Sequence, residues 1–364
     1  TAFQLLAVIF QLQSLQEFGG VSSTHLDWTM VPYVRKSFYK HYVDGLRYVE
    51  VKDEQYIQQY VYDIINDPEC FTEKQSIDSS WWKENNKAYT YALDMTKKEV
   101  YQAVEGMYHN LNTLQSRSGN QLPFTSINYG TCTEPEGRMV TKAILDVSIK
   151  GIGKLHKTSI FPCGIFQCMK GVNRKPGDPN YDLFQLALKS TAKRLYPNYA
   201  NVDWSGNDGY DVNDPKTYFS TMGCRTANGW DINGMGQTKD GRGNICPVTI
   251  ILPTLAMEAI DSVWNRIPEE SKNYIIVSKY DWCKNEIVVE EFMRILDKKI
   301  HEAKDMLLER FEWICSQSPD SAKFMYENGV MEGYIPEENI VPELEQETEV
   351  KETWNFSSRT IRAC

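Results

Sequence analysis

The chain has 364 residues, of which 41% are apolar and 24% are charged, a composition typical of a globular protein with a large core. Its formal net charge of -10 argues against an electrostatic grip on nucleic acid, because phosphate binding requires clustered Lys and Arg. No apolar run in the sequence approaches the ~20 residues that span a bilayer. The sequence therefore predicts neither a nucleic-acid partner nor a membrane partner.

The cysteines indicate the compartment. There are nine, an odd number with irregular spacing in a long chain, which favours a reducing cytoplasm over a disulfide framework. The close pairs Cys163/Cys168 and Cys224/Cys246 both lack metal-ligand spacing. We therefore expect no metal site within this chain.

The first hundred residues give a weak pattern. Residues 1–45 predict two helices, the first stopped by the glycines of FGGVSST and the second capped by Ser22, Ser23 or Thr24. Residues 50–95 are rich in Tyr, Trp, Asp and Lys with little periodicity, and we interpret them as an irregular insertion. From Lys97 a helix is expected to run to about Leu114.

Alternating elements follow. FTSINYGT (124–131) predicts a strand with Ser126 and Asn128 on one face, and Thr133 and Glu136 have the spacing of a capping box before the next helix. Further along the chain, SIFPCGIFQC predicts a strand, DPNYDLFQLALKSTAKRLY a helix, and TYFSTM and CPVTIILP two more strands. Because parallel strands need long crossovers, this alternation predicts an α/β fold with a parallel sheet. A long amphipathic helix over 292–314 and an aperiodic polar tail complete the chain.

One cysteine has an unusual setting. In STMGCRT, Cys224 lies between the predicted strand TYFSTM and a glycine-rich loop. A buried structural cysteine is one interpretation. A hydrolytic nucleophile is another, but it needs a histidine within reach, and none of the five histidines lies in a recognisable partner motif.

The same stretch carries a family resemblance. TYFSTMGCRT, DGRGN (240–244), PVTIILP, LNTLQSRSGNQLPFTSINYGT and DPNYDLFQLALKSTAKRLYP together resemble the catalytic subunit of the anaerobic (class III) ribonucleotide reductases. The resemblance runs from Thr1 to about Pro342 and is diluted across residues 50–95. It implies an α/β fold that is part of a ten-stranded barrel of two parallel half-sheets, with a finger loop carrying a cysteine at its centre.

The resemblance also implies a chemistry for Cys224. In this family the fingertip cysteine becomes a transient thiyl radical, generated from a glycyl radical on a second loop, and abstracts the 3′ hydrogen of the ribose. An activating enzyme with an iron-sulfur cluster and S-adenosylmethionine installs the glycyl radical. Such a relay uses a thiol rather than a thiolate, so it needs a dry pocket and no adjacent histidine or metal.

Two further positions match the pattern of the family. Asn244 matches the asparagine of GRxN, which lines the substrate pocket in members that use formate, and Met222 would lie beside the thiol. An asparagine of a tight turn and a core methionine are the alternatives. The implied partners are ribonucleoside triphosphate substrates, formate, nucleotide effectors, the activating enzyme and a second copy in a homodimer.

The sequence also departs from the family. Members carry an upstream strand with a second cysteine, and downstream the rest of the barrel, a zinc-binding cysteine cluster and the glycyl radical loop. We therefore expect a fragment with a partial barrel domain (1–342) and a divergent polar tail (343–364), inactive on its own. The alternatives are a pyruvate formate-lyase-like enzyme, whose fingertip would carry adjacent cysteines, and a non-catalytic remnant or nucleotide-binding regulator.

Overall fold

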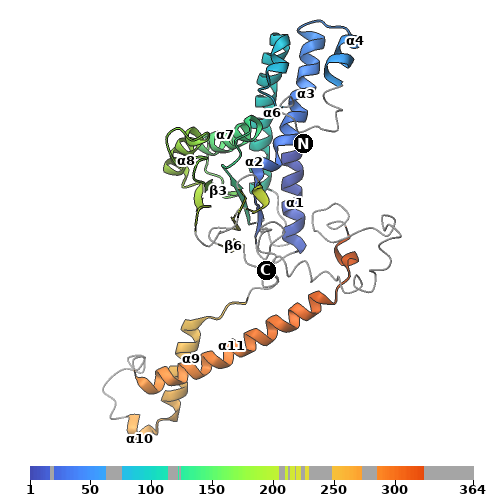
Figure 1. Cartoon of the computed structure of the whole chain (residues 1–364). Coiled ribbons are helices and arrows are strands. Elements are labelled where there is room, and N and C mark those ends of the chain that lie inside the picture. The colour runs from blue at the N-terminus through green and yellow to red at the C-terminus, as the bar shows by residue number, and fades with distance from the viewer. Residues whose placement is uncertain are drawn as a thin grey trace. The chain divides into compact units, whose positions relative to one another are not determined.

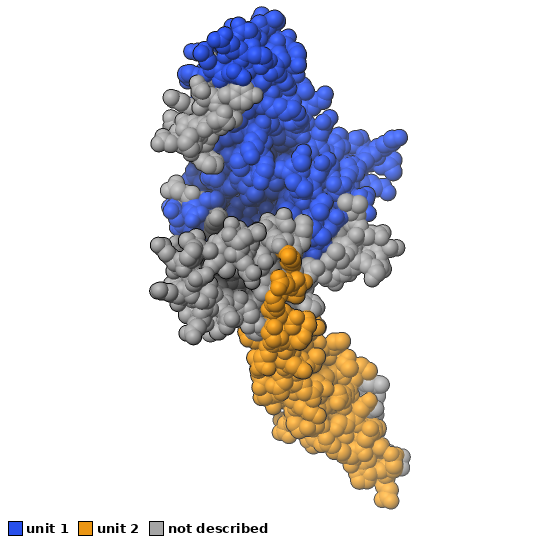
Figure 2. All heavy atoms as spheres, turned by 90° about the vertical axis from the view of Figure 1, so that its right-hand side faces the viewer, with its two compact units in different colours: residues 1–243, 362–364 blue, residues 244–361 orange. Residues whose placement is uncertain are grey.

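A computed structural model gives the fold of the chain. It describes residues 1–16, 20–62, 76–113, 122, 124–204, 210–211, 214–217, 219–222, 226–228, 248–272 and 285–323. The chain divides into two compact units, residues 1–243 with 362–364 and residues 244–361 (Figure 2). Among the described helices, none combines the length and the apolar character needed to cross a bilayer.

The first unit is built on a parallel sheet. Its strands lie in the order β1-β2-β3-β4, and every neighbouring pair is parallel. The strands are β1 (Val21–Ser23), β2 (Thr125–Tyr129), β3 (Cys163–Cys168) and β4 (Asn198–Asn201). The predicted α/β fold with a parallel sheet is thus confirmed, and the predicted strands at β2 and β3 are present.

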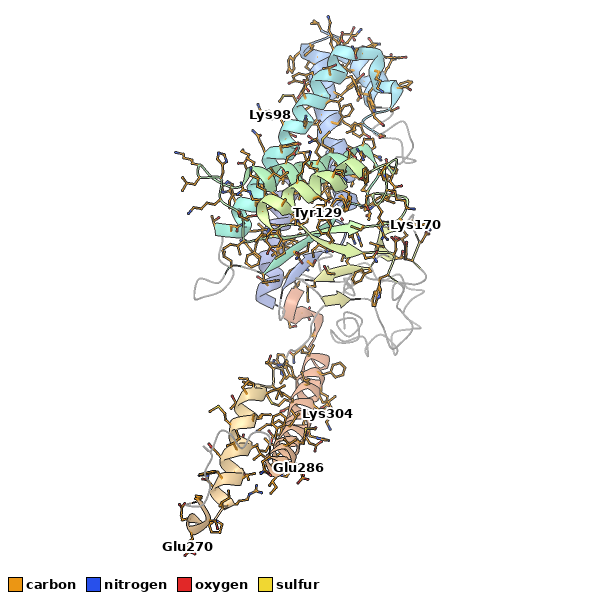
Figure 3. The ribbon with its side chains drawn as sticks, turned by 90° about the vertical axis from the view of Figure 1, so that its left-hand side faces the viewer. Lys98, Tyr129, Lys170, Glu270, Glu286 and Lys304 are labelled. Atoms are coloured by element: carbon orange, nitrogen blue, oxygen red, sulfur yellow. The ribbon has the colours of Figure 1, made fainter. Side chains whose placement is uncertain are left out.

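Helices supply the crossovers between these strands and cover one face of the sheet (Figures 1 and 3). Ile127, Tyr129 and Phe166 point from the sheet into a core shared with these helices. The helices that contribute to this core include α1 (Ala2–Gln16), α2 (Leu26–Thr29), α3 (Val31–Tyr48), α6 (Asn86–Thr113), α7 (Pro135–Lys150) and α8 (Tyr181–Arg194). Burial of these apolar faces is the main term that holds the layer on the sheet.

A second core lies where α3 and α6 extend beyond the sheet. Trp82 is fully buried, and its ring lies 4.9 Å from that of Tyr42 and 5.5 Å from that of Phe38, measured between centroids. Gly45 permits close helix packing, because a Cβ there would lie 2.9 Å from the Cα of Ala88. The segments around this core include α4 (Glu54–Ile57), the π-helical turn η1 (Gln58–Tyr62) and the 3-10 helix η3 (Ser80–Asn85).

The interpretation of residues 50–95 as irregular therefore needs correction. Residues 54–62 and 80–95 are helical, and α6 begins at Asn86 rather than near Lys97. The aromatic residues that obscure the sequence periodicity are the ones that fill the second core. Whether the segment is an insertion relative to the family stays a prediction.

Two other local predictions differ from the structure. Val21–Ser23 forms the strand β1, where the sequence suggested the cap of a helix. The N-cap of α7 is Glu134 and not Thr133, because Pro135 occupies the first turn, where its fixed φ suits a helix start. The predicted capping box is consequently absent from α7, and Gly151 ends this helix with φ 79.

The second unit contains helices in its described part. They are α9 (Leu252–Arg266), α10 (Glu269–Lys272), α11 (Glu286–Cys315) and the 3-10 helix η7 (Pro319–Ala322). The predicted long helix is confirmed as α11, which packs on α9 around Leu255, Ile260 and Ile295. The predicted strand CPVTIILP is wrong where it is described, because residues 248–251 are irregular and Leu252 begins α9 with Pro253 in its first turn.

A short hairpin completes the described strands of the first unit. It pairs β5 (Ser220–Met222) with β6 (Thr226–Asn228) in antiparallel register, preceded by the 3-10 helix η5 (Pro215–Thr217). The described residues thus hold a four-stranded parallel sheet and a two-stranded hairpin. The ten-stranded barrel and its finger loop remain predictions from the resemblance.

Candidate functional site

The face of the sheet away from the helices is polar. Ser126 and Asn128 of β2 project from this face, as the sequence predicted, and are fully buried together with Gln167 of β3. Buried polar side chains are costly unless they are hydrogen-bonded. Their hydrogen bonds go to the strand β5, to Phe219 just before it and to β1. This face of the sheet therefore binds the hairpin.

Asn128 makes the most extensive contact with the hairpin. Its Oδ1 accepts from the backbone N–H of Thr221 at 3.2 Å, and its Nδ2 donates to the backbone O of Thr221 at 3.0 Å. The same Nδ2 also lies within hydrogen-bond distance of Ser22 Oγ, at 3.1 Å, and of Ser23 O, at 3.0 Å. Asn128 therefore joins β1, β2 and β5 at one point.

Gln167 and two serines add further bonds. Gln167 Nε2 donates to the backbone O of Phe219 at 2.9 Å and to Ser220 Oγ at 3.3 Å. Ser220 Oγ donates to the backbone O of Thr24 at 3.0 Å, and Ser22 Oγ donates to the backbone O of Thr221 at 2.9 Å. Consecutive residues of β5 are thus bonded to the parallel sheet through side chains.

The hairpin contains Met222, one of the residues that the resemblance singles out, and its two strands flank Cys224 in the sequence. Met222 ends β5, is 9% exposed and pairs with Thr226 of β6. Cys224 stands between these two paired residues in the sequence, but it lies outside the described residues, and so does Asn244. The structure therefore places Met222 in a buried position beside the polar face and tests neither Cys224 nor Asn244.

The loop after β2 is fixed next to this face. Asp27 is fully buried, and its Oδ2 accepts from the backbone N–H groups of Gly130 at 2.8 Å and Cys132 at 3.0 Å. Burial raises the pKa of this carboxyl, and the backbone hydrogen bonds partly oppose that effect. Asn173 and Asn180, both fully buried, each donate from Nδ2 to the backbone O of Gly130. In open α/β sheets ligands bind beyond the carboxyl ends of the strands. Beyond the carboxyl end of β2, the backbone of Gly130 and Cys132 is held by these buried side chains.

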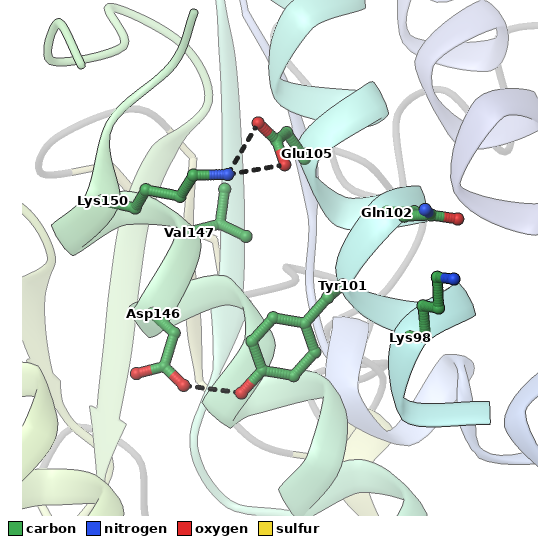
Figure 4. Close-up of a pocket in the computed structure, with 7 residues that line it drawn as sticks. All are labelled: Lys98, Tyr101, Gln102, Glu105, Asp146, Val147 and Lys150. Carbon is green, nitrogen blue, oxygen red and sulfur yellow. Dashed lines mark hydrogen bonds and ion pairs between the residues drawn. The ribbon is translucent and has the colours of Figure 1, made fainter. Parts of the chain in front are cut away.

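A groove lies between α6 and α7 (Figure 4). Lys150 Nζ lies 3.2 Å from Glu105 Oε2, and Tyr101 donates its hydroxyl to Asp146 at 2.5 Å. Burial, and then the bond to Asp146, raise the pKa of Tyr101. Both pairs join α6 to α7. We therefore interpret the groove as part of the packing contact between these two helices.

Metal chemistry has no support in the described ranges. They contain no group of three or more His, Cys, Asp or Glu side chains arranged to hold an ion. The polar face instead presents amides and hydroxyls, whose hydrogen bonds go to backbone groups and to one another.

Ser22 and Gln167 were missed as site residues in the sequence. The signal for Gln167 was a polar side chain in the otherwise apolar run CGIFQC. Ser22 could be found only after β1 was known to be a strand, since its three residues give no alternation to detect.

Comparison with known proteins defines the class. The fold and the site describe an α/β protein with a hairpin bound across the polar face of a parallel sheet. A family model described as anaerobic ribonucleoside-triphosphate reductase matches residues 1–350. The chain belongs to this family.

Individual relatives agree with this assignment. The anaerobic ribonucleoside-triphosphate reductase of Haemophilus influenzae is 28% identical over 329 residues, which cover 90% of this chain and 37% of the relative. The protein of the same name from Enterobacteria phage T4 is 30% identical over 71% of this chain and 36% of its own length. That of Escherichia coli is 38% identical over 46% of this chain and 23% of its own length. The chain thus spans between about a quarter and just over a third of the length of these relatives.

Proposed function

We propose that this chain carries the thiyl-radical hairpin of an anaerobic ribonucleoside-triphosphate reductase, which reduces ribonucleoside triphosphates to deoxyribonucleoside triphosphates. The observation that carries this proposal is the hairpin β5–β6, which flanks Cys224 in the sequence and is hydrogen-bonded to the polar face of the sheet. A radical must be presented to one atom of the substrate and shielded from others. A hairpin held by buried bonds meets the first of these needs.

Cys224 is proposed to act as the hydrogen-atom acceptor. Its sulfur radical takes the 3′ hydrogen of the ribose, so that an S–H bond forms, a C–H bond breaks and the unpaired electron moves to the sugar. A glycyl radical elsewhere in the holoenzyme supplies the oxidising equivalent. The step involves no thiolate, so the chain needs no base beside Cys224.

Met222 and Asn244 are proposed to line the substrate. Met222 is an uncharged, buried residue at the end of β5, and its proposed role is to exclude water from the thiol. The carboxamide of Asn244 offers both a donor and an acceptor to ribose hydroxyls or to formate, the proposed reductant.

The partners follow from the same proposal. They are the triphosphate substrate, formate, nucleotide effectors, the radical-generating activating enzyme and a second copy of the subunit, in a cytoplasmic enzyme. The partial barrel domain (1–342), the polar tail (343–364) and the need for further family segments are part of this proposal. No observation favours the pyruvate formate-lyase alternative or the regulator alternative over the reductase.

An anaerobic reconstitution tests the proposal. The chain would be combined with a polypeptide that carries the remaining segments of the Haemophilus influenzae relative, together with an activating enzyme, and deoxynucleotide formation would be measured with triphosphate and formate. We expect Cys224→Ser to abolish product. Cys168→Ser is the matched control, since Cys168 is a partly buried free cysteine of the same unit and should be dispensable.

Two results would contradict the proposal. Product formation by the Cys224→Ser protein at the wild-type rate would remove the thiyl role. A wild-type mixture that forms no product but binds the triphosphate would favour the nucleotide-binding regulator. Equal rates with a dithiol in place of formate would refute only the choice of reductant.

A further inference from the structure

We propose that Asn128 is a positioning residue for the hairpin: through paired hydrogen bonds to the backbone of Thr221 it sets where the chain that follows presents Cys224. This inference rests on the proposed function, since it concerns the placement of the proposed radical cysteine. It adds a role for a residue of β2 that itself touches no reacting atom.

One edge of β5 faces away from its partner strand β6. In an antiparallel pair, alternate residues direct their N–H and C=O groups toward the partner strand and away from it. Thr221 pairs with Ala227 in register, yet its N–H and C=O groups are both bonded to Asn128. The backbone of Thr221 is therefore turned away from β6 and toward the sheet.

The side chain of Asn128 occupies this edge of β5. The unpaired N–H and C=O groups of an exposed strand edge can pair with another strand. At a buried edge these groups need hydrogen-bond partners within the protein. The carboxamide of Asn128 supplies an acceptor and a donor, as the backbone of a neighbouring strand does. It is fully buried, so water does not replace these bonds readily.

Two serines add to the bonds made at Thr221. Ser126 Oγ donates to Ser22 Oγ at 2.8 Å, and Ser22 Oγ in turn donates to the backbone O of Thr221 at 2.9 Å. The carbonyl of Thr221 thus receives two bonds, one from Ser22 and one from Asn128. Because both of its lone pairs are used, this carbonyl has a defined direction as well as a defined position.

The hydrogen-bonded Thr221 lies close in sequence to the proposed radical residue Cys224. Thr221 precedes Cys224 by three residues, and Met222 is the last residue of β5. By this proposal, an anchor three residues away restricts where Cys224 can be presented. A shift of about 1 Å in a reacting group is enough to slow a reaction strongly, so the anchor should act on turnover more than on substrate affinity.

The experiment uses hydrogen exchange and thiol labelling on the full chain. Asn128→Ala removes all the hydrogen bonds of the carboxamide. Asn128→Asp keeps the acceptor for the Thr221 N–H but replaces the donating Nδ2 with an oxygen, which repels the Thr221 carbonyl. Residue-resolved exchange at the Thr221 amide would be compared with exchange at the Phe166 amide in the same protein. Alkylation of Cys224 would be compared with that of Cys168 by peptide mass spectrometry.

Asn180→Ala is the matched control. Asn180 is also fully buried, donates from Nδ2 to the backbone O of Gly130 and of Cys132, and accepts from Arg138 at 2.6 Å, and these bonds do not reach the hairpin. A merely structural role for Asn128 predicts the same effects from both variants. A positioning role predicts that exchange at Thr221 and labelling of Cys224 accelerate in the Asn128 variants and not in Asn180→Ala.

We expect the Thr221 amide of Asn128→Ala to exchange about tenfold faster or more, with Phe166 unchanged relative to the control. Ser22→Ala, which leaves the carboxamide in place, should give a smaller acceleration and serves as the test if Asn128→Ala does not fold. Exchange at Thr221 that is no faster than in Asn180→Ala would overturn the proposal. Because these readouts need no turnover, a failed reconstitution with accelerated exchange would reject the reductase function and not the anchor.

Discussion

Arg35 of α3 donates from Nε to Oε1 of Glu136 on α7 at 2.8 Å, and the Glu136 side chain is completely buried. The same oxygen accepts from the backbone N–H of Ile77 at 3.0 Å. This carboxylate therefore ties two helices and the segment before η3 together. Such a buried pair is costly to break from one side, because the remaining charge loses its buried partner.

Removing the buried partner should accordingly destabilise the first unit. We expect Glu136→Ala to lower the free energy of unfolding by about 3–5 kcal/mol. Glu134 is the matched control, since it also meets Arg35, at 3.3 Å, but its side chain is 45% exposed. Glu134→Ala should cost less than about 1 kcal/mol. Urea unfolding of both variants gives the comparison, and equal losses would refute a special role for the buried pair.

Two glycines in helices should respond oppositely to alanine. A Cβ on Gly137, in the first turns of α7, would collide with the Sγ of Cys132 and lie 3.1 Å from the backbone O of Asp27. Overpacking of this kind costs about 1–3 kcal/mol, and here it would displace the loop after β2. Gly106 in α6 has nothing within 4 Å of such a Cβ, so Gly106→Ala should stabilise by about 0.5–1 kcal/mol. Melting temperatures that shift in the same direction for both variants would contradict this assignment.

The second unit should lose stability in acid through Glu291. The hydrogen bond from Arg294, followed by that from Ser262, lowers the pKa of Glu291 to about 2 from its usual 4.5. A carboxyl with a lowered folded-state pKa stabilises the fold above its unfolded value, and that contribution disappears as the pH falls toward the folded value. The difference in stability between wild type and Glu291→Gln should thus be full above about pH 5 and vanish near pH 2.

Hydrogen exchange in α9 and α11 can measure this difference between pH 5 and pH 2. Glu290→Gln is the control, because Glu290 is the exposed neighbour of Glu291 in the same helix. The wild type could remain more stable than Glu291→Gln by the same amount at pH 2. That result would show that the ion pairs with Arg266 and Arg294 are not the source of the difference in stability.

Much of the fold could be predicted from local patterns. β2 alternates in sequence, β3 is a nearly continuous apolar run, and the helices α7, α8 and α11 have regular apolar periods. Each of these elements was expected near its observed place. The errors have physical causes. β1 is too short to alternate, α6 begins inside an aromatic segment whose packing partners are distant, and VTIIL leads into α9 because Pro253 suits a first helical turn better than a strand.

The candidate site divides in a similar way. The placement of Asn128 on one face of its strand followed from alternation, but its bond to Thr221 joins residues 93 positions apart, and no local pattern encodes that contact. Met222 was named through a resemblance, and the structure shows it buried at the end of β5. The roles of Cys224 and Asn244 stay predictions.

The thiols of the first unit should differ in their reactivity. Burial is the main cause that raises the pKa of Cys168 to about 11, and Asp203 adds to it while Arg174 opposes it. At pH 8 only about a thousandth of this thiol is then ionised. Because the thiolate is the nucleophile, alkylation of Cys168 should accelerate about tenfold for each pH unit between 8 and 10.

Cys132 provides the contrast in the same molecule. It is completely buried, and burial, with the nearby carboxylate of Asp27, raises the pKa of its thiol still further. Its labelling should therefore require opening of the loop after β2, and its rate should follow denaturant concentration more than pH. Peptide mass spectrometry after timed alkylation measures both sites in one sample. Rapid labelling of Cys132 at pH 8 in the native protein would show that this loop opens readily, against the fixed geometry that Asp27 gives it.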